Sequence, residues 1–127
     1  MPAFEDLLVW RRAREMVAEL YRMTGAGRLE RDWGLRNQMQ RAAVSVISNI
    51  AEGFERGRRG ELRQFLGIAK GSCGELRSQL YVALDVGYIG DDDFARMHGR
   101  LLELSRLLDR FRAAVIRQQE TSGARPK

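Results

Sequence analysis

Polar side chains that interrupt the apolar pattern of residues 38–54 are the first candidates for chemistry. This polar strip consists of Ser45, Ser48, Asn49 and Glu52. Residues three or four apart share a helix face, so the strip lies beside the apolar face if the segment is helical. It then faces solvent, lines a ligand site, or forms a buried hydrogen-bonding seam with a second polar row, Ser72, Glu75 or Gln79. Catalysis would also need a partner base or a metal, and none has suitable spacing.

Arginine is densest just after this segment. The arginine cluster consists of Arg56, Arg58, Arg59 and Arg63, and only Glu55 and Glu61 oppose it. Such a cluster is either a solvated turn or a patch that binds anions such as nucleic-acid phosphates. Oligomerisation would favour the second interpretation, because several copies of the turn around one rim would add their fields. A second basic group, Arg11, Arg12 and Arg14, is diluted by Glu15 and Glu19.

Metal and cofactor sites are not predicted. His98 is the one histidine and Cys73 the one cysteine, so soft ligands are too few for a transition-metal site. Asp91, Asp92 and Asp93 lack the glycine and the distal glutamate of a calcium loop and fit a helix start better. The glycines at 25 and 27 follow an expected helix rather than a strand, which does not match a phosphate-binding loop.

Composition bounds the class of protein. The chain has 127 residues, enough for one domain, and a net charge of +5. Of its 22 basic residues 20 are arginine, which suits phosphate recognition but also follows from a G·C-rich genome. We expect a cytoplasmic protein without a membrane role, because the sequence contains no apolar run of about 18 residues and no signal-peptide pattern.

Helical periodicity dominates the chain. The most regular stripe is Phe94, Met97, Leu101, Leu104, Leu108, Phe111 and Val115, at alternating spacings of three and four. Three earlier segments share this period, and no segment shows the alternation of a strand. The pattern predicts an all-α, up-down-up-down antiparallel four-helix bundle in one domain, residues 1–120. Its helices are expected at about 4–24, 33–55, 61–87 and 92–119, with Asp32 as an N-cap and residues 121–127 as a flexible tail.

Two features of the expected helices suggest close contacts between surfaces. Gly67, Gly71, Gly74 and Ser78 form a small-residue strip at helical spacing, which would let another backbone approach within the bundle or between subunits. Four aromatic residues lie at the edges of the apolar stripes, namely Trp10, Trp33, Tyr81 and Tyr88. A slim bundle cannot bury all of them, so we expect a subunit interface to cover some.

Several motifs carry a resemblance to a known family. They are Phe4-Glu5-Asp6-Leu7, Val9-Trp10, Leu35-Arg36 with Gln38, Arg41-Ala42-Ala43-Val44-Ser45, Ser48-Asn49-Ile50-Ala51-Glu52-Gly53, Phe65-Leu66, Ala69 with Gly71-Ser72, and Gly87-Tyr88-Ile89. With them the chain resembles the 23S ribosomal RNA intervening-sequence family. The resemblance implies a small bacterial protein with an up-and-down four-helix bundle, a ring of five subunits and no enzymatic activity. The ribosomal label of some members reflects the location of their genes within rRNA-gene insertions.

One position departs from the family pattern. The family commonly has proline before the Ser-Asn-Ile-Ala-Glu-Gly run, where this chain has Ile47. Because proline removes a backbone hydrogen bond, we expect the second long helix to be straighter here. A bundle of similar structure, the accessory protein of diversity-generating retroelements, is a basic pentamer that engages a reverse transcriptase and nucleic acid, which is an analogy of fold only.

These observations predict a non-enzymatic homo-oligomer that binds RNA or DNA through its basic surface as an accessory or scaffold protein. The alternative is a protein–protein interaction module without a nucleic-acid role, whose grooves receive a partner helix. Retention of a partner after nuclease treatment would favour the alternative.

Overall fold

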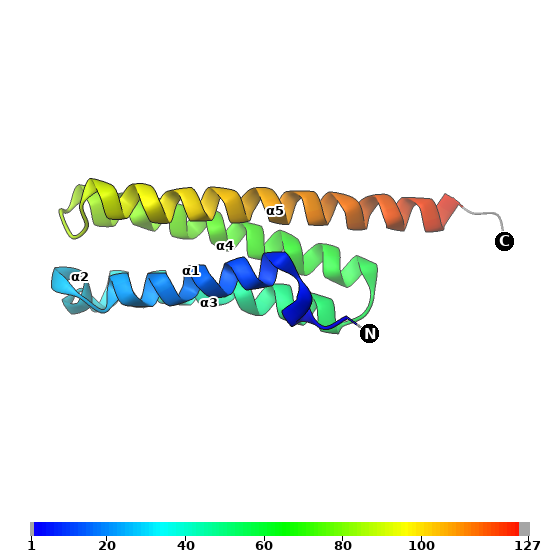
Figure 1. Ribbon diagram of the computed structural model, residues 1–127, viewed down its shortest axis with the longest axis horizontal. Coiled ribbons are helices and arrows are strands. Elements are labelled where there is room, and N and C mark those ends of the chain that lie inside the picture. Colours follow the sequence, from blue (N-terminus) through cyan, green and yellow to red (C-terminus); the bar gives the residue numbers. More distant parts are fainter. Residues whose placement is uncertain (1, 125–127) are drawn as a thin grey trace.

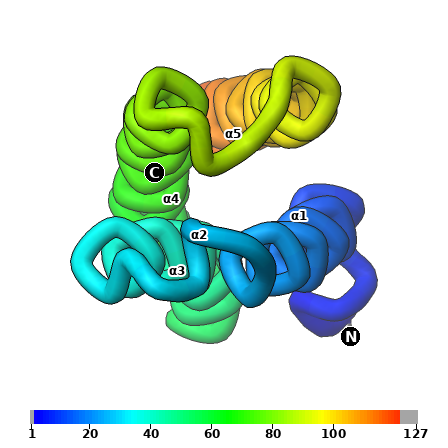
Figure 2. The backbone as a smooth tube through the Cα atoms, turned by 90° about the vertical axis from the view of Figure 1, so that its left-hand side faces the viewer, coloured from blue at the N-terminus to red at the C-terminus, as the bar shows by residue number. Residues whose placement is uncertain are grey.

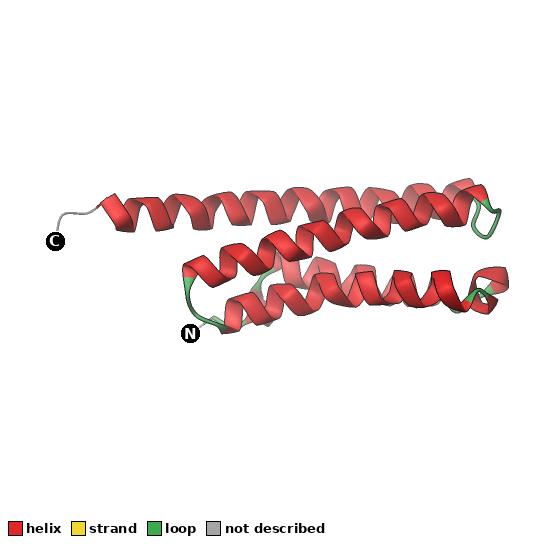
Figure 3. Ribbon diagram, turned by 180° about the vertical axis from the view of Figure 1, so that it is seen from behind, coloured by secondary structure: helices red, strands yellow, loops and turns green. Residues whose placement is uncertain are grey.

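Four long helices make up most of residues 2–124, the part of the chain that the computed structural model describes (Figure 1). In chain order the elements are the 3-10 turn η1 (Phe4–Asp6), α1 (Leu8–Thr24), the short α2 (Gly27–Arg31), α3 (Trp33–Glu55), α4 (Arg59–Asp85) and α5 (Asp91–Ala124). No strand occurs between residues 2 and 124 (Figure 3). The prediction of an all-α, up-down-up-down four-helix bundle is confirmed.

The long helices occupy the four corners of the bundle, and each packs against two neighbours (Figure 2). The extensive contacts are α3 with α4, α4 with α5, and α1 with α3, whereas α1 and α5 share the smallest of the four interfaces. The loops between consecutive long helices are short, which forces them to run antiparallel. The open side of the bundle is therefore the seam between α1 and α5.

Apolar residues at helical spacing fill the space between the four helices. Five members of the most regular stripe are buried, namely Met97, Leu101, Leu104, Leu108 and Val115, and Phe94 and Phe111 are partly buried. Facing them from the other helices are fully buried side chains that include Met16, Leu20, Met39, Ile50, Leu66 and Leu76. Each such side chain contributes roughly 1.5–3 kcal/mol on removal from water, so the stripes determine which face of each helix points inward.

The N-terminal helix starts later than predicted. Residues Phe4–Asp6 form a 3-10 turn, and Leu7 is extended (φ −75°, ψ 128°) before α1 begins at Leu8. The backbone N–H of Ala3 donates to a carboxylate oxygen of Asp6 at 2.9 Å, which stabilises the separate turn. This local bond competes with a continuous helix from residue 4.

The connection between the first two long helices is also not the plain loop that was expected. It contains α2, and Leu29 of α2 is fully buried. Burial of this leucine offsets part of the entropy lost when the short segment is ordered. Asp32 then caps α3 as predicted, because its side chain accepts from the Leu35 N–H at 3.1 Å.

The ends of α3 agree with the prediction, the ends of α4 and the start of α5 differ by one or two residues, and α5 continues beyond its predicted end. Gly57 (φ 73°) turns the chain between α3 and α4, and Gly87 (φ 79°) follows the end of α4. Residues 121–124 were expected in the flexible tail but continue α5, and residues 125–127 lie outside the described part. Helix formation continues because the first strong helix breaker in this segment is Pro126.

The small-residue strip on α4 has no backbone packed on it within residues 2–124. A Cβ added at Gly71 would meet nothing within 4 Å, and one at Gly67 would meet only the Arg112 side chain, at 3.5 Å. The close approach occurs instead on α3, where a Cβ at Gly53 would lie 2.7 Å from Phe65 Cβ. Gly53 therefore allows the close packing of α3 against α4. None of the described helices has the length and apolar character required to cross a lipid bilayer.

Candidate nucleic-acid interface and polar seams

Arg56 of the arginine cluster is committed to contacts within the chain. Its guanidinium lies 2.9 Å from Glu52 and 3.2 Å from Glu61, and it also covers the Phe65 ring at 5.2 Å. The hydrogen bond with Glu52 raises the pKa of Arg56 above its ordinary value. Arg56 therefore joins the end of α3 to the start of α4 and contributes little free charge.

The other arginines of the cluster point outward to different degrees. The Arg58 side chain is 83% exposed, and its nearest carboxylate, Glu61, is 3.9 Å away. Arg59, at the start of α4, is also exposed. Arg63 donates to the Gln119 side chain at 3.5 Å. The members of the arginine cluster therefore differ in their contacts, and Arg58 is the most available to a ligand.

A fifth arginine joins this end of the bundle from α5. Arg112 Nε donates to the backbone oxygen of Arg63 at 3.3 Å. Sequence reasoning missed Arg112 because it lies 49 residues further along the chain. The turn itself has a groove of about 380 Å³ beside it, whose floor includes Phe54 and Leu62 and whose edge includes Arg58.

The polar strip on α3 is only partly a seam between helices. The Ser45 and Ser72 hydroxyls are 2.8 Å apart, and the Asn49 amide donates to both the hydroxyl and the backbone oxygen of Ser45, at 3.0 and 2.7 Å. These side chains are half-buried between α3 and α4. The inclusion of Ser48 and Glu52 in a buried seam is wrong, because both are exposed. The helical repeat places Ser48 and Glu52 outside the face of α3 that contacts α4.

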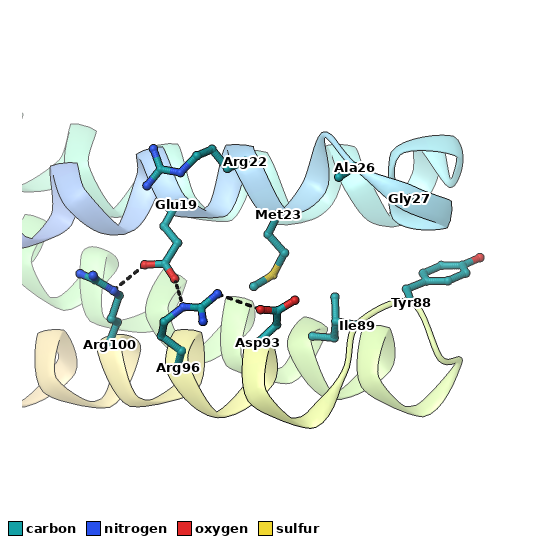
Figure 4. A pocket seen from close by; sticks show the side chains of 10 residues that line it. All are labelled: Glu19, Arg22, Met23, Ala26, Gly27, Tyr88, Ile89, Asp93, Arg96 and Arg100. Carbon is teal, nitrogen blue, oxygen red and sulfur yellow. Dashed lines mark hydrogen bonds and ion pairs between the residues drawn. The ribbon is translucent and has the colours of Figure 1, made fainter.

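The seam between α1 and α5 contains a buried carboxylate that the sequence analysis did not select. Glu19 of α1 is 8% exposed and lies between Arg96 and Arg100 of α5 (Figure 4). Arg96 is 2.7 Å from Glu19 and 2.8 Å from Asp93. The hydrogen bond with Glu19 is the main reason why the pKa of Arg96 is raised.

Further ion pairs continue along the same seam. Glu15 is 3.4 Å from Arg12 and 3.5 Å from Arg100, and Arg12 is 3.5 Å from Glu103. Glu15 therefore dilutes the second basic group through Arg12, as the sequence suggested, whereas Glu19 pairs with Arg96 and Arg100 of α5 instead. The matching four-residue spacings of Glu15 with Glu19 and of Arg96 with Arg100 were the sequence signal for this seam.

The seam opens into a groove of about 580 Å³ near α2, lined by Glu19, Arg22, Tyr88, Asp93, Arg96 and Arg100 among others (Figure 4). The carboxylates of Glu19 and Asp93 on its walls pair with Arg96 and Arg100. Arg22, which also lines the groove, has no ion pair among residues 2–124. This arrangement holds two helices together, and it provides neither a nucleophile with its base nor a metal-ligand set.

Reactive side chains elsewhere are enclosed by neighbours. His98 stacks on Phe94 at 5.1 Å and meets the edge of Tyr81 at 5.6 Å. Cys73 is fully buried, and burial raises the pKa of its thiol to about 12. Within the described residues no group of three or more His, Cys, Asp or Glu side chains could hold a metal ion. Asp91, Asp92 and Asp93 occupy the first turn of α5, where they complement the helix dipole.

Comparisons with known proteins agree with the architecture. One solved structure, a protein with unknown function from the S23 ribosomal protein family of Bacteroides thetaiotaomicron VPI-5482, is similar with a TM-score of 0.78. The similarity covers 84% of this chain and 96% of that chain, and at 18% sequence identity it shows the fold alone. No curated protein is significantly similar in sequence. The model of the 23S rRNA-intervening sequence protein family matches residues 5–110, and the chain therefore belongs to this family.

Proposed function

We propose that the protein is a non-enzymatic, homo-oligomeric scaffold that binds the backbone of RNA or DNA through exposed arginines. The observation that carries the proposal is the separation of charges in the bundle. Carboxylates such as Glu15, Glu19 and Glu61 are used in ion pairs, while several outward arginines have no ionic partner within the described residues. They include Arg11 and Arg22 on α1 and Arg106, Arg110 and Arg117 on α5.

The three arginines on α5 form a row along the outside of the bundle. Arg106, Arg110 and Arg117 are spaced by four and seven residues, so they share one face of the helix. At 1.5 Å per residue the row is roughly 16 Å long. Arg58 adds a further exposed charge at the α3–α4 turn. Phosphate contacts of this kind supply affinity without reading sequence.

Binding of labelled RNA and DNA at low and at moderate salt tests this proposal. We expect affinity to fall steeply with salt, because counterions are released from the nucleic acid. The double variant Arg58→Glu, Arg59→Glu should bind more weakly still and show a shallower salt dependence. Absence of any binding at low salt would contradict the proposal.

The matched control is Arg106→Glu, Arg110→Glu. Either double variant changes the net charge by four, from +5 to +1. A difference in affinity between the two variants therefore reflects where the nucleic acid binds and not the total charge. A larger loss at 58 and 59 would assign the interface to the turn, and a larger loss at 106 and 110 would assign it to the row on α5.

Self-association is part of the proposal because apolar side chains remain exposed on α3 and α4. Val44 is 38%, Ile68 46% and Val82 48% exposed, and the uncovered small-residue strip lies beside them on α4. An interface between copies would cover this surface. We propose five subunits, the number that the family resemblance implies. Light scattering should give a multiple of the single-chain mass of 14.5 kDa at micromolar concentration, and a single-chain mass would contradict self-association.

The proposal includes no catalysis, since neither His98 nor Cys73 is presented to a ligand with a partner base.

A protein-interaction role is the second candidate function, and one groove favours it. Between the start of α1 and α5 lies an apolar groove of about 200 Å³, lined by Leu7, Leu8, Val9, Leu107 and Phe111. An apolar groove of this type accepts the face of a partner helix. A partner recovered from the native host and retained after nuclease treatment would support this role.

A further inference from the structure

An exposed tryptophan lies at the α2 end of the bundle among arginines from other elements. Trp33, the first residue of α3, is 69% exposed, and the Arg36 guanidinium covers one side of its ring at 5.1 Å. It lines an open groove of about 540 Å³ together with Arg28 and Arg31 of α2, Asp32, and Tyr88 of the α4–α5 loop. Figure 1 shows α2 and this loop at the same end of the molecule.

Hydrogen bonds fix the Tyr88 ring and the Arg36 guanidinium that lies against Trp33. The Tyr88 hydroxyl donates to Asp32 at 3.0 Å, and this bond is the main cause of the raised pKa of Tyr88. Arg28 lies over the Tyr88 ring at 5.6 Å and donates to the Gly87 backbone oxygen at 2.8 Å. Arg36 donates to the Glu30 backbone oxygen at 2.9 Å, which fixes the guanidinium that supports Trp33.

Charge in the groove favours an anion. Both carboxylate oxygens of Asp32 already accept hydrogen bonds, one from Leu35 N–H and one from Tyr88. Glu30 is the other acid of this segment and is exposed. Against these acids stand Arg28, Arg31 and Arg36. The Arg31 side chain is exposed, lines the groove and has no ion pair among residues 2–124.

We propose that this groove binds an unpaired nucleotide of an RNA or DNA strand. Its base stacks on the ring face of Trp33 opposite Arg36, and its phosphate is bound by Arg31 and Arg28. The combination of an open aromatic face with adjacent guanidinium groups is the chemistry of single-strand binding, and stacking tolerates any base. The inference rests on the proposed nucleic-acid role and adds a preference for unpaired over duplex nucleic acid, because bases in a duplex are already stacked.

Fluorescence of Trp33 tests the inference directly. Trp10 is the second tryptophan, so Trp10→Phe gives a protein in which Trp33 is the only emitter. A ten-residue oligothymidylate and an abasic oligomer of equal length and charge are added at low salt, while a label on each oligomer reports binding by anisotropy. We expect both to bind and only the oligomer with bases to quench Trp33.

Substitution of Trp33 provides the second arm. In Trp33→Ala, affinity for the oligothymidylate should fall roughly five- to a hundredfold, the usual range for loss of one stacking platform, while affinity for the abasic oligomer stays unchanged. Trp33→Phe should restore part of the affinity. Tyr81→Ala is the matched control, because Tyr81 is also exposed, at 49%, but lies on α4 beside Phe94. Circular dichroism should show that all variants remain folded.

Three results would overturn the inference. If the oligothymidylate binds without changing Trp33 emission, the nucleotide lies elsewhere and the proposed nucleic-acid role survives. If neither oligomer binds at low salt, both proposals fail. If iodide cannot quench Trp33 in the free protein, another protein surface covers the ring, and the groove belongs to an interface between proteins.

Discussion

Cys73 shows how far burial alone changes a reactive group. The thiol is fully buried on α4, and desolvation raises its pKa from 9.0 to about 12, while Arg77 opposes this shift. Only the thiolate is a good nucleophile, so this cysteine is protected from alkylation and disulfide exchange as long as the bundle is folded. The residue functions as a small apolar filler of the core.

The Cys73 thiol should make stability dependent on pH above pH 9. Below pH 9 both the folded and the unfolded state carry the neutral thiol, so its contribution to stability is fully present. As pH rises from about 9 to 12 the unfolded state ionises first, and the free energy of unfolding should fall by at most about 1.4 kcal/mol per pH unit from this group. Urea unfolding at pH 8 and pH 10.5 should show a smaller loss in Cys73→Ala than in the wild type. Equal losses would contradict this assignment.

At the scale of helices, two glycines with similar sequence contexts have opposite roles. Gly53 is buried in α3, where an added Cβ would lie 2.7 Å from Phe65 Cβ and 3.3 Å from a Leu62 methyl carbon. Gly71 is exposed on α4 with nothing within 4 Å. The first glycine permits close α3–α4 packing, whereas the second only weakens its own helix within a single chain.

Alanine substitution should separate these roles. Gly53→Ala forces α3 and α4 apart and should lower the free energy of unfolding by about 1–3 kcal/mol, as overpacking does. Gly71→Ala should raise it by about 1 kcal/mol through helix propensity. Chemical denaturation of both variants under dilute, monomeric conditions makes the comparison. Destabilisation by Gly71→Ala only at high protein concentration would show that another subunit packs on the strip.

At the scale of the whole molecule, the seam between α1 and α5 is stabilised by different interactions from the other three interfaces between long helices. It is the smallest of the helix interfaces and contains the Glu15 and Glu19 ion pairs, whereas the other interfaces are chiefly apolar. Glu19 is the member that matters most, because it is buried while Arg96 and Arg100 are half-exposed. If its carboxylate were lost, Arg96 would keep only Asp93 and Arg100 only Glu15 as ionic partners.

Removal of Glu19 should therefore weaken this seam selectively. Glu19→Ala is expected to cost about 1–2 kcal/mol, less than a fully buried pair would, because both arginines can rehydrate. Hydrogen exchange should increase in α1 more than in α3 or α4. Glu75→Ala on the exposed face of α4 is the control and should change stability by less than 0.5 kcal/mol, approximately the range for a surface site. Equal effects of the two substitutions would contradict a special role for Glu19.

Most of the fold follows from periodicity. The apolar stripes and the Asp32 cap predicted four antiparallel helices with ends within a few residues of those observed, apart from the later start of α1 and the extension of α5. Short-range patterns determine which face of a helix is apolar, because the helical repeat is fixed. The small turn η1, the short helix α2 and the continuation of α5 escaped prediction, because local bonds and the burial of Leu29 decided them.

The sequence by itself determined the family, the helical bundle and the abundance of arginine. Only the tertiary structure decided which arginines are free, since pairing depends on distances between residues far apart in the chain. Arg56 is neutralised by its neighbours on α3 and α4, whereas Glu19 meets Arg96 across 77 positions of sequence and leaves α1 with an unopposed outer face. Trp33 and Tyr88 likewise come together only at the end of the folded bundle. Helix periodicity is a local property, but charge pairing and groove formation arise from the packing of whole helices.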